Sequence, residues 1–173
     1  MVAMHYAVRH PGRISKLILS STAAQFRLDE TMKMMRKLGG PRAADVAREF
    51  FSNPSKAAYE TYGQVCLPLY SNPNVPAAGA FRDRAIERPE VAFHFFSDEM
   101  AQMDMRAEIA NITCPTLVIG GAIDPVTPPI CSKAIADAIG DNARLRMFEG
   151  CGHGPHRDDP TGAEKIMRHF LAD

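Results

Sequence analysis

The chain has 173 residues and a formal net charge of zero, with 20 Lys and Arg against 20 Asp and Glu. The sequence contains no basic stripe or polybasic segment, so we expect it to bind neither nucleic acid nor an anionic membrane surface. Hydrophobic residues make up 46% of the sequence, which predicts a folded domain with a real core. No apolar run approaches the roughly 20 residues of a transmembrane helix, and Met1–Arg13 lacks the layout of a signal peptide.

The four cysteines are scattered along the chain, and no C-x-x-C pair occurs. They are Cys66, Cys114, Cys131 and Cys151. Without a secretion signal this usage predicts reduced thiols and a cytoplasmic location. No His and Cys cluster has zinc-ligand spacing, so we expect no metal and no cofactor. The set His153, His156 and Asp158 is an open alternative for a metal, although it has no fourth ligand in view.

The first 24 residues predict one helix and one strand of a core. Met1–Arg9 is helical in character and is stopped by His10-Pro11-Gly12, but it has no N-cap signal. The chain therefore begins as though it were already inside a helix. Ile14–Leu19 reads as a short buried strand that opens into the polar turn Ser20–Thr22.

Residues 25–105 predict an all-helical insertion, because Met, Ala, charged and aromatic residues dominate there and β-branched runs are absent. Gly39-Gly40-Pro41 ends the first helix, in which Leu28, Met32 and Met35 recur at helical spacing. The further helices are expected at Arg42–Phe51, Lys56–Leu67 (stopped by Pro68), Ala77–Glu87 and Pro89–Met100, with a loop at Ser71–Pro76. The apolar residues that could line a pocket are Met32, Met34, Met35, Phe93, Phe95 and Phe96. Plain core is the alternative for these residues, since helices must bury one face.

Residues 106–173 predict the rest of the core, with strands and helices in alternation. A short amphipathic helix at Asp104–Ala110 precedes the buried strand Thr116–Ile119. Pro129–Ile139 has the clearest helical period and is closed by Gly140. The last two elements are a strand at Leu145–Phe148 and a helix, entered through Asp159-Pro160, whose apolar face is Ala163, Ile166, Met167, Phe170 and Leu171. Three strands separated by helices predict an α/β fold with a three-stranded parallel sheet.

Two Gly-rich turns follow the last two strands, and each presents one polar residue. The first turn presents Asp124 and the second presents His153. Because function collects at the carboxyl ends of parallel strands, we expect these side chains to meet. A carboxylate that holds one imidazole nitrogen fixes the tautomer and stabilises the imidazolium formed at the other nitrogen. The pair is therefore a candidate for two thirds of a nucleophile–histidine–acid triad.

These stretches resemble the C-terminal part of an α/β-hydrolase. Cys114–Ile119 resembles the seventh strand of that family, Asp124 falls at its acid, and Gly150–His153 resembles its histidine turn. Val2–Ile14 resembles the helix after the nucleophile elbow leading into strand six, and the insertion matches the position of the cap. The resemblance implies a Ser-Asp-His triad that hydrolyses an ester, amide or lactone bond of a small-molecule substrate. The runs Asp124–Pro128 and Arg157–Pro160 are similar to the proline-iminopeptidase and small-ester or lactone hydrolase branches.

The sequence departs from the family in its nucleophile, because no G-x-S-x-G motif occurs. Ser20 and Ser21 end a strand, but they are in the wrong place and no helix follows them. Cys151 shares the turn of His153, which is poor geometry for attack, and Cys114 reads as buried. We therefore expect the chain to start just after the elbow, without the nucleophile and oxyanion hole, and to be inactive in isolation.

Two other functions remain open at the level of sequence. One is a non-catalytic binding or interaction module derived from a hydrolase. The other is a hydrolase whose missing half comes from another chain, or a different chemistry that uses His153 and His156. When the chain is alone, the strand Ile14–Leu19 would lack a neighbour on one side, which predicts self-association through an exposed sheet edge.

Overall fold

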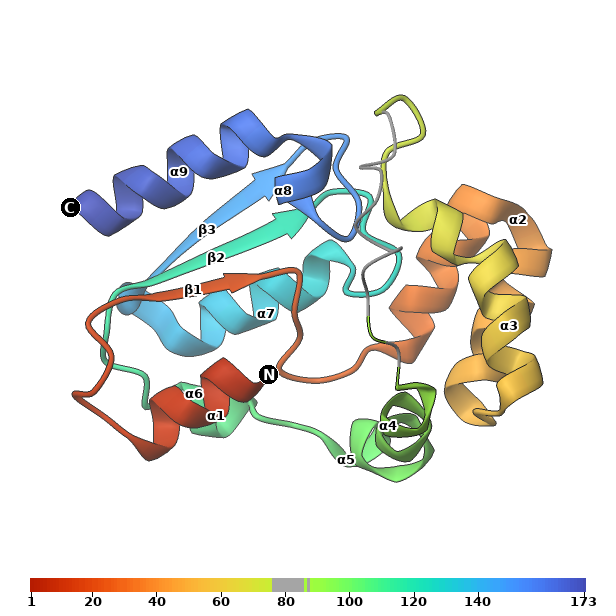
Figure 1. Ribbon diagram of the computed structural model, residues 1–173. Coiled ribbons are helices and arrows are strands. Elements are labelled where there is room, and N and C mark those ends of the chain that lie inside the picture. Colours follow the sequence, from red (N-terminus) through yellow and green to blue (C-terminus); the bar gives the residue numbers. More distant parts are fainter. Residues whose placement is uncertain (76–85, 87) are drawn as a thin grey trace.

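The computed structural model describes residues 1–75, 86 and 88–173, and its core is a parallel three-stranded sheet (Figure 1). The strands lie in the order β1 (Leu17–Ser20), β2 (Thr116–Gly121) and β3 (Ala143–Phe148). All six residues of β2 are buried, as expected of a central strand that is covered on both faces. The predicted α/β class and three-stranded parallel sheet are confirmed.

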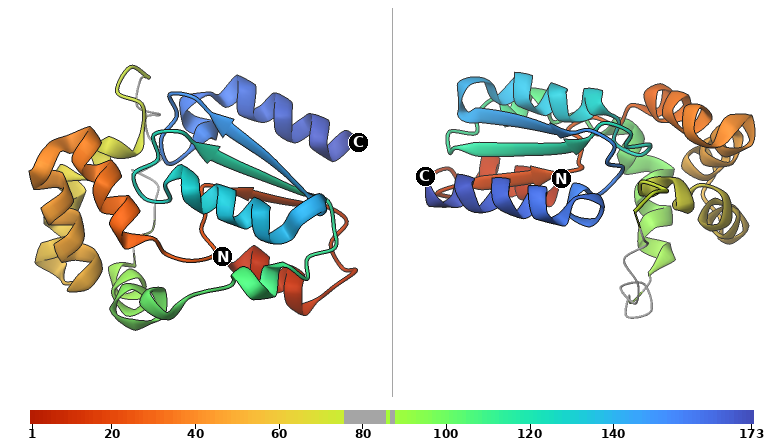
Figure 2. Two further views of the ribbon diagram at one scale, coloured as in Figure 1. Left: turned by 180° about the vertical axis from the view of Figure 1, so that it is seen from behind. Right: turned by 90° about the horizontal axis from the view of Figure 1, so that it is seen from above.

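Helices cover both faces of this sheet (Figure 2). On one face, Leu19 and Val118 pack with Ile135 and Ile139 of helix α7 (Pro129–Ile139). Helices α1 (Val2–Arg9) and α6 (Arg106–Ile109) contribute Met4 and Ile109 to the same cluster. On the other face, Leu117 and Ile119 pack with Phe170 of helix α9 (Pro160–Ala172). Side chains alternate between the faces of a strand, so neighbouring residues of β2 enter different clusters.

Several predicted boundaries in the core are corrected by the structure. The first strand begins at Leu17 and not at Ile14, because pairing starts where the Leu17 N–H donates to the Pro115 carbonyl at 3.0 Å. The predicted buried face of the last helix wrongly included Leu171, which is 57% exposed. Successive helical residues point about 100° apart, so a last turn that directs Phe170 at the sheet directs Leu171 into solvent.

The helices between β1 and β2 form a second unit beyond the carboxyl ends of the strands (Figure 1), and we call it the helical insertion. It consists of α2 (Leu28–Ser52), α3 (Lys56–Val65), the 3₁₀ turn η1 (Leu67–Tyr70), α4 (Pro89–His94), the π-helical turn η3 (Phe95–Glu99) and α5 (Met100–Gln102). Its own hydrophobic cluster includes Met32, Met35, Phe50, Phe51 and Tyr62. The backbone enters and leaves it through adjacent segments, since Gln25 bridges Asp104 and the Met105 N–H donates to the Ala24 carbonyl.

Most predicted helices of the insertion are confirmed. Gly40 takes a left-handed conformation (φ 76°) inside α2, which bends there into the two predicted helices. The predicted stop at Pro68 is wrong in detail, because α3 ends at Val65 and Pro68 lies inside η1, where an early proline needs no N–H donor. The predicted helix Ala77–Glu87 lies outside the described residues except for Ile86. The division of the chain into 1–24, 25–105 and 106–173 stays a prediction.

The remaining elements are the 3₁₀ turn η4 (Gly140–Asn142) and the short helix α8 (Pro155–Asp158). Within the described ranges, no helix combines the length and the apolar character that crossing a membrane requires.

Candidate active site

The Asp124 carboxylate is buried in the loop that follows β2, and it is held by three protein donors. Its Oδ1 accepts the N–H groups of Val126 at 2.8 Å and Thr127 at 2.9 Å. Its Oδ2 accepts the Thr127 hydroxyl at 2.8 Å. Asp124 is 0% exposed, and an ionised carboxylate is stable at such a site only when its oxygens accept hydrogen bonds. The three donors therefore fix the orientation of the side chain.

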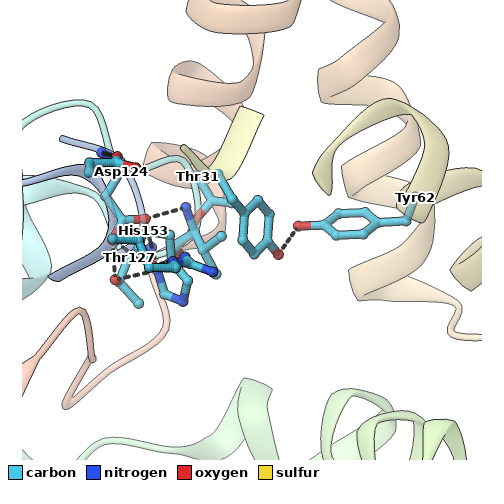
Figure 3. A network of polar contacts seen from close by, with 10 residues as sticks. Thr31, Tyr62, Asp124, Thr127 and His153 are labelled. Atoms are coloured by element: carbon cyan, nitrogen blue, oxygen red, sulfur yellow. Dashed lines mark hydrogen bonds and ion pairs between the residues drawn. The ribbon is translucent and has the colours of Figure 1, made fainter. Parts of the chain in front are cut away.

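The His153 ring lies directly against this carboxylate (Figure 3). Its Nδ1 is 2.9 Å from Oδ2 and 3.1 Å from Oδ1 of Asp124. The backbone N–H of His153 donates to the Tyr70 carbonyl at 2.6 Å, and the Arg157 guanidinium donates to the His153 carbonyl at 2.7 Å. The two residues singled out in the sequence are thus brought together, by loops that follow neighbouring strands. With Nδ1 engaged by the acid, Nε2 is the nitrogen left to exchange a proton.

The acid loop and the histidine turn approach each other at Gly121. A Cβ at this position would lie 2.1 Å from the Gly152 carbonyl oxygen and 2.3 Å from that of Cys151. The Ala122 N–H donates to the Phe148 carbonyl and the Ile123 N–H to the Cys151 carbonyl, both at 3.0 Å. This contact distance requires glycine, which explains one of the glycines in the sequence motif.

Sequence reasoning missed the residues that hold the two turns in place. Thr127 lies three positions after Asp124, and an Asp whose side chain accepts N–H groups two and three residues later is a recognisable local turn. Asp158 had no such signal. Its Oδ2 accepts the N–H groups of Gly152 at 2.7 Å and of Asn72 at 3.0 Å, and so joins the histidine turn to the helical insertion.

A cavity of about 670 Å³ lies between the helical insertion and His153. Thr127 and Val126 contribute to its wall from the acid loop. The aromatic residues that line it are Phe26, Phe50, Phe51, Tyr59, Tyr62, Tyr70, Phe95 and Phe96. The Tyr70 ring meets the His153 imidazole edge to face, with centroids 5.3 Å apart. The histidine therefore lines a cavity that is rich in aromatic side chains.

The predicted pocket residues divide into three groups. Phe95 and Phe96 line the cavity, as the sequence suggested. Met32, Met35 and Phe93 belong to the hydrophobic cluster behind it, in agreement with the core alternative. Met34 lines a separate surface depression beside Pro128.

The alternative nucleophiles and metal ligands are also placed by the structure. Ser21 lines the cavity, with φ 45° and a buried hydroxyl that has no hydrogen-bond partner among the described residues. No helix follows it, so it lacks the N-terminal N–H groups of a nucleophile elbow. Cys151 is buried, whereas Cys114 is half-buried and not fully buried as expected. Over residues 1–75, 86 and 88–173, no three His, Cys, Asp or Glu side chains group as metal ligands, and His153, His156 and Asp158 are no exception.

Comparison with known sequences assigns this chain to a family. Residues 1–160 match the family described as serine aminopeptidase, S33. The proline iminopeptidase PfmaB of Pestalotiopsis fici is 26% identical over 98% of this chain and 63% of its own length. The pimeloyl-[acyl-carrier protein] methyl ester esterase of Chromobacterium violaceum is 28% identical over 90% of this chain and 59% of its own length. The chain therefore spans about three fifths of the length of these two relatives.

Solved structures show the same fold. A proline iminopeptidase from Mycobacterium smegmatis superposes with a TM-score of 0.68 at 21% identity, over 99% of this chain and 61% of that one. MenH from S. aureus gives the same TM-score and identity, over 99% of this chain and 64% of its own. Together with the family match over residues 1–160, the paired acid and histidine at the ends of neighbouring parallel strands make this chain a member of the α/β-hydrolase family.

Proposed function

We propose that this chain supplies the acid and the histidine of a serine hydrolase that cleaves an ester, amide or lactone bond. The observation that carries the proposal is the 2.9 Å contact between His153 Nδ1 and Asp124 Oδ2, beside a cavity that His153 lines together with many aromatic residues. The names of the relatives, an iminopeptidase and a methyl ester esterase, support this class of bond. The nucleophile and the oxyanion hole are proposed to come from polypeptide outside these 173 residues.

In the proposed mechanism Asp124 holds the His153 ring with Nε2 toward the cavity. Nε2 takes the proton of the serine hydroxyl as its oxygen attacks the carbonyl carbon, and Asp124 stabilises the imidazolium that forms. The imidazolium then returns this proton to the leaving group, which leaves an acyl-enzyme. Water attacks the acyl-enzyme in a second round that uses His153 in the same way. By itself the chain holds the base and its orienting acid but no nucleophile, so we propose that it is inactive in isolation. We also propose that the protein is located in the cytoplasm.

The test is to read the coding DNA in frame upstream of Met1 and to express the longer product. We expect a G-x-S-x-G motif there, and a serine-directed phosphonate should label that serine. In the longer product, Asp124→Asn should lower kcat by about 10³-fold or more, because the imidazole loses its orienting acid. His153→Ala should have at least as large an effect, whereas the control His156→Ala, an exposed neighbour, should leave kcat unchanged.

Two results would contradict the proposal. An upstream frame without G-x-S-x-G would favour the alternative, a binding or interaction module that uses the cavity without catalysis. Phosphonate labelling of the 173-residue chain, abolished by Ser21→Ala, would instead place the nucleophile at the strained serine that shares the cavity with His153.

A further inference from the structure

The geometry points to an uncharged aryl group as the ligand of the aromatic cavity, bound so that its ester or amide carbonyl faces His153. The part about the carbonyl rests on the proposed function. The part about the aryl group rests on the cavity alone and can be measured without any reaction. Three features of the described wall carry it: its ring geometry, its charges and the pairing of two tyrosine hydroxyls.

The rings of the wall meet one another at steep or tilted angles, and the described ring pairs include no parallel stack. Phe96 makes such contacts with Phe50 at 77° and with Phe51 at 86°, and Phe51 meets Tyr62 at 72°. A wall built this way presents both ring faces and ring edges to the cavity. The ring of an aryl ligand can bind to both faces and edges, because the positive edge of one ring attracts the negative face of another. A saturated ring of the same size has no such quadrupole and gains only from burial.

The described wall disfavours a ligand that carries a charge. Among the described lining residues no side chain is a carboxylate, and the Arg88 guanidinium is exposed, so that solvent screens its charge. The Asp124 carboxylate does not line the cavity and is already bound by His153 and Thr127. Among these described residues, an ammonium or carboxylate group in the ligand would lose its hydration without gaining a buried counter-charge.

Two tyrosine hydroxyl groups of the wall are paired with each other. Tyr62 and Tyr70 share a hydrogen bond at 2.7 Å between their hydroxyl oxygens (Figure 3). Tyr62 is 3% exposed, and burial raises the pKa of its hydroxyl well above the ordinary value, so this group stays neutral. The pair does not require a polar atom from the ligand, and the aryl group can remain unsubstituted where it meets these rings.

The test measures binding of four methyl esters to the 173-residue chain by ligand-detected NMR at neutral pH. Methyl 4-ethylbenzoate is the neutral aryl probe, and methyl 4-(aminomethyl)benzoate is its cationic isostere. Methyl 4-ethylcyclohexanecarboxylate removes the aromatic ring, and monomethyl terephthalate adds a negative charge. We expect the neutral aryl ester to bind about tenfold or more tightly than the cation, because a buried charge without a partner is costly. It should also bind about threefold more tightly than the cyclohexane ester.

A matched pair of variants locates the binding site. Phe96→Leu removes a lining ring and should weaken binding of the neutral aryl ester by about threefold to tenfold. Phe93→Leu removes a ring of the same hydrophobic cluster that does not line the cavity, and it should leave the affinity unchanged. Phe95→Leu is a second lining variant in case Phe96→Leu does not fold.

Three outcomes would overturn the inference. The first is that the cationic or the anionic ester binds as tightly as the neutral one. The second is that the cyclohexane ester does so. The third is that Phe93→Leu weakens binding as much as the lining variants. Because no turnover is involved, each result is independent of whether the longer product is labelled by a phosphonate, so failure of this inference and failure of the proposed hydrolase are distinguishable.

Discussion

At the scale of single residues, the position of His153 depends on close backbone contacts as much as on its bond to Asp124. The Gly152 and Cys151 carbonyl oxygens occupy the space where a side chain on Gly121 would begin. The acid loop and the histidine turn can therefore lie against each other only while position 121 is glycine. Close-packed interiors transmit such a clash to the surrounding loops, because few voids are available to absorb it.

Gly121→Ala should destabilise the fold by about 2 kcal/mol, since the new Cβ overpacks a site closed by backbone atoms. Gly63→Ala is the matched control: Gly63 lies inside α3, and its Cβ would meet only Leu67, at 3.8 Å. This control should stabilise the protein by about 0.5–1 kcal/mol, because alanine is the better helix former. Urea unfolding of both variants measures the difference. Equal stability of the two variants would contradict the close contact at Gly121.

At the scale of elements, the short helix α8 connects parts of the molecule that are far apart in sequence. Its Asp158 carboxylate accepts N–H groups from the histidine turn and from Asn72, which follows η1. The Asn72 side-chain amide donates in turn to the Gly150 carbonyl at 2.7 Å. Together with the hydrogen bond from the His153 N–H to the Tyr70 carbonyl, these contacts hold the turn of His153 against the helical insertion that lines the cavity.

Asp158→Asn should lower the free energy of unfolding by about 1–2 kcal/mol, because a neutral amide oxygen is a weaker acceptor for two N–H groups than a carboxylate. Amide hydrogen exchange at Gly152 and Asn72 should become faster. The control is Asp137→Asn, which removes an exposed carboxylate from α7 and should change neither quantity. Unchanged exchange at both amides in the Asp158 variant would show that its carboxylate does not hold the two segments together.

At the scale of the whole molecule, β1 is one of the two outer strands of the described sheet, and within it β1 pairs with β2. The N–H groups of Leu17 and Ser21 donate to carbonyls of the β2 segment, so the alternating N–H of Ser20 points away from it. An outer strand with outward N–H groups can pair with another chain. We propose that the isolated 173-residue chain self-associates through this edge.

Ser20→Pro should shift the isolated chain toward the monomer, because proline removes the outward donor without removing a bond to β2. Ser20→Ala, which keeps the N–H, is the control and should associate like the parent. Sedimentation velocity over a dilution series measures both. A parent chain that is monomeric at all concentrations, or a proline variant that associates equally well, would contradict the proposal.

Predictions from the sequence succeeded where the signal is local. Helix α7 has its predicted bounds, because its apolar residues repeat with the helical period and Gly140 can adopt the left-handed conformation (φ 72°) that ends it. The kink at Gly40 followed from Gly39-Gly40-Pro41 for the same kind of reason. The start of β1 was misplaced, because pairing with Pro115, about a hundred residues away, decides it.

The pairing of Asp124 with His153 followed from sequence in part. Parallel strands end at the same edge of a sheet, so two turns after neighbouring strands meet there. By contrast, nothing local distinguishes Phe96, which lines the cavity, from Phe93, which packs behind it. Both belong to one continuous helical stretch, and only the packing of α2 and α3 against that stretch separates their surroundings.

The sequence by itself determined the α/β class, the two polar residues at the strand ends and the helical character of the insertion. Each of these follows from turn residues or from the period of apolar residues within a short stretch of sequence. The tertiary structure alone decided which aromatic residues line the cavity, that Asp158 binds Asn72, and that Tyr70 lies against His153. The last two contacts join segments more than eighty residues apart, as the bond between Asn72 and Asp158 illustrates with its separation of 86 positions. Such contacts depend on how whole elements pack, and no local pattern encodes that packing.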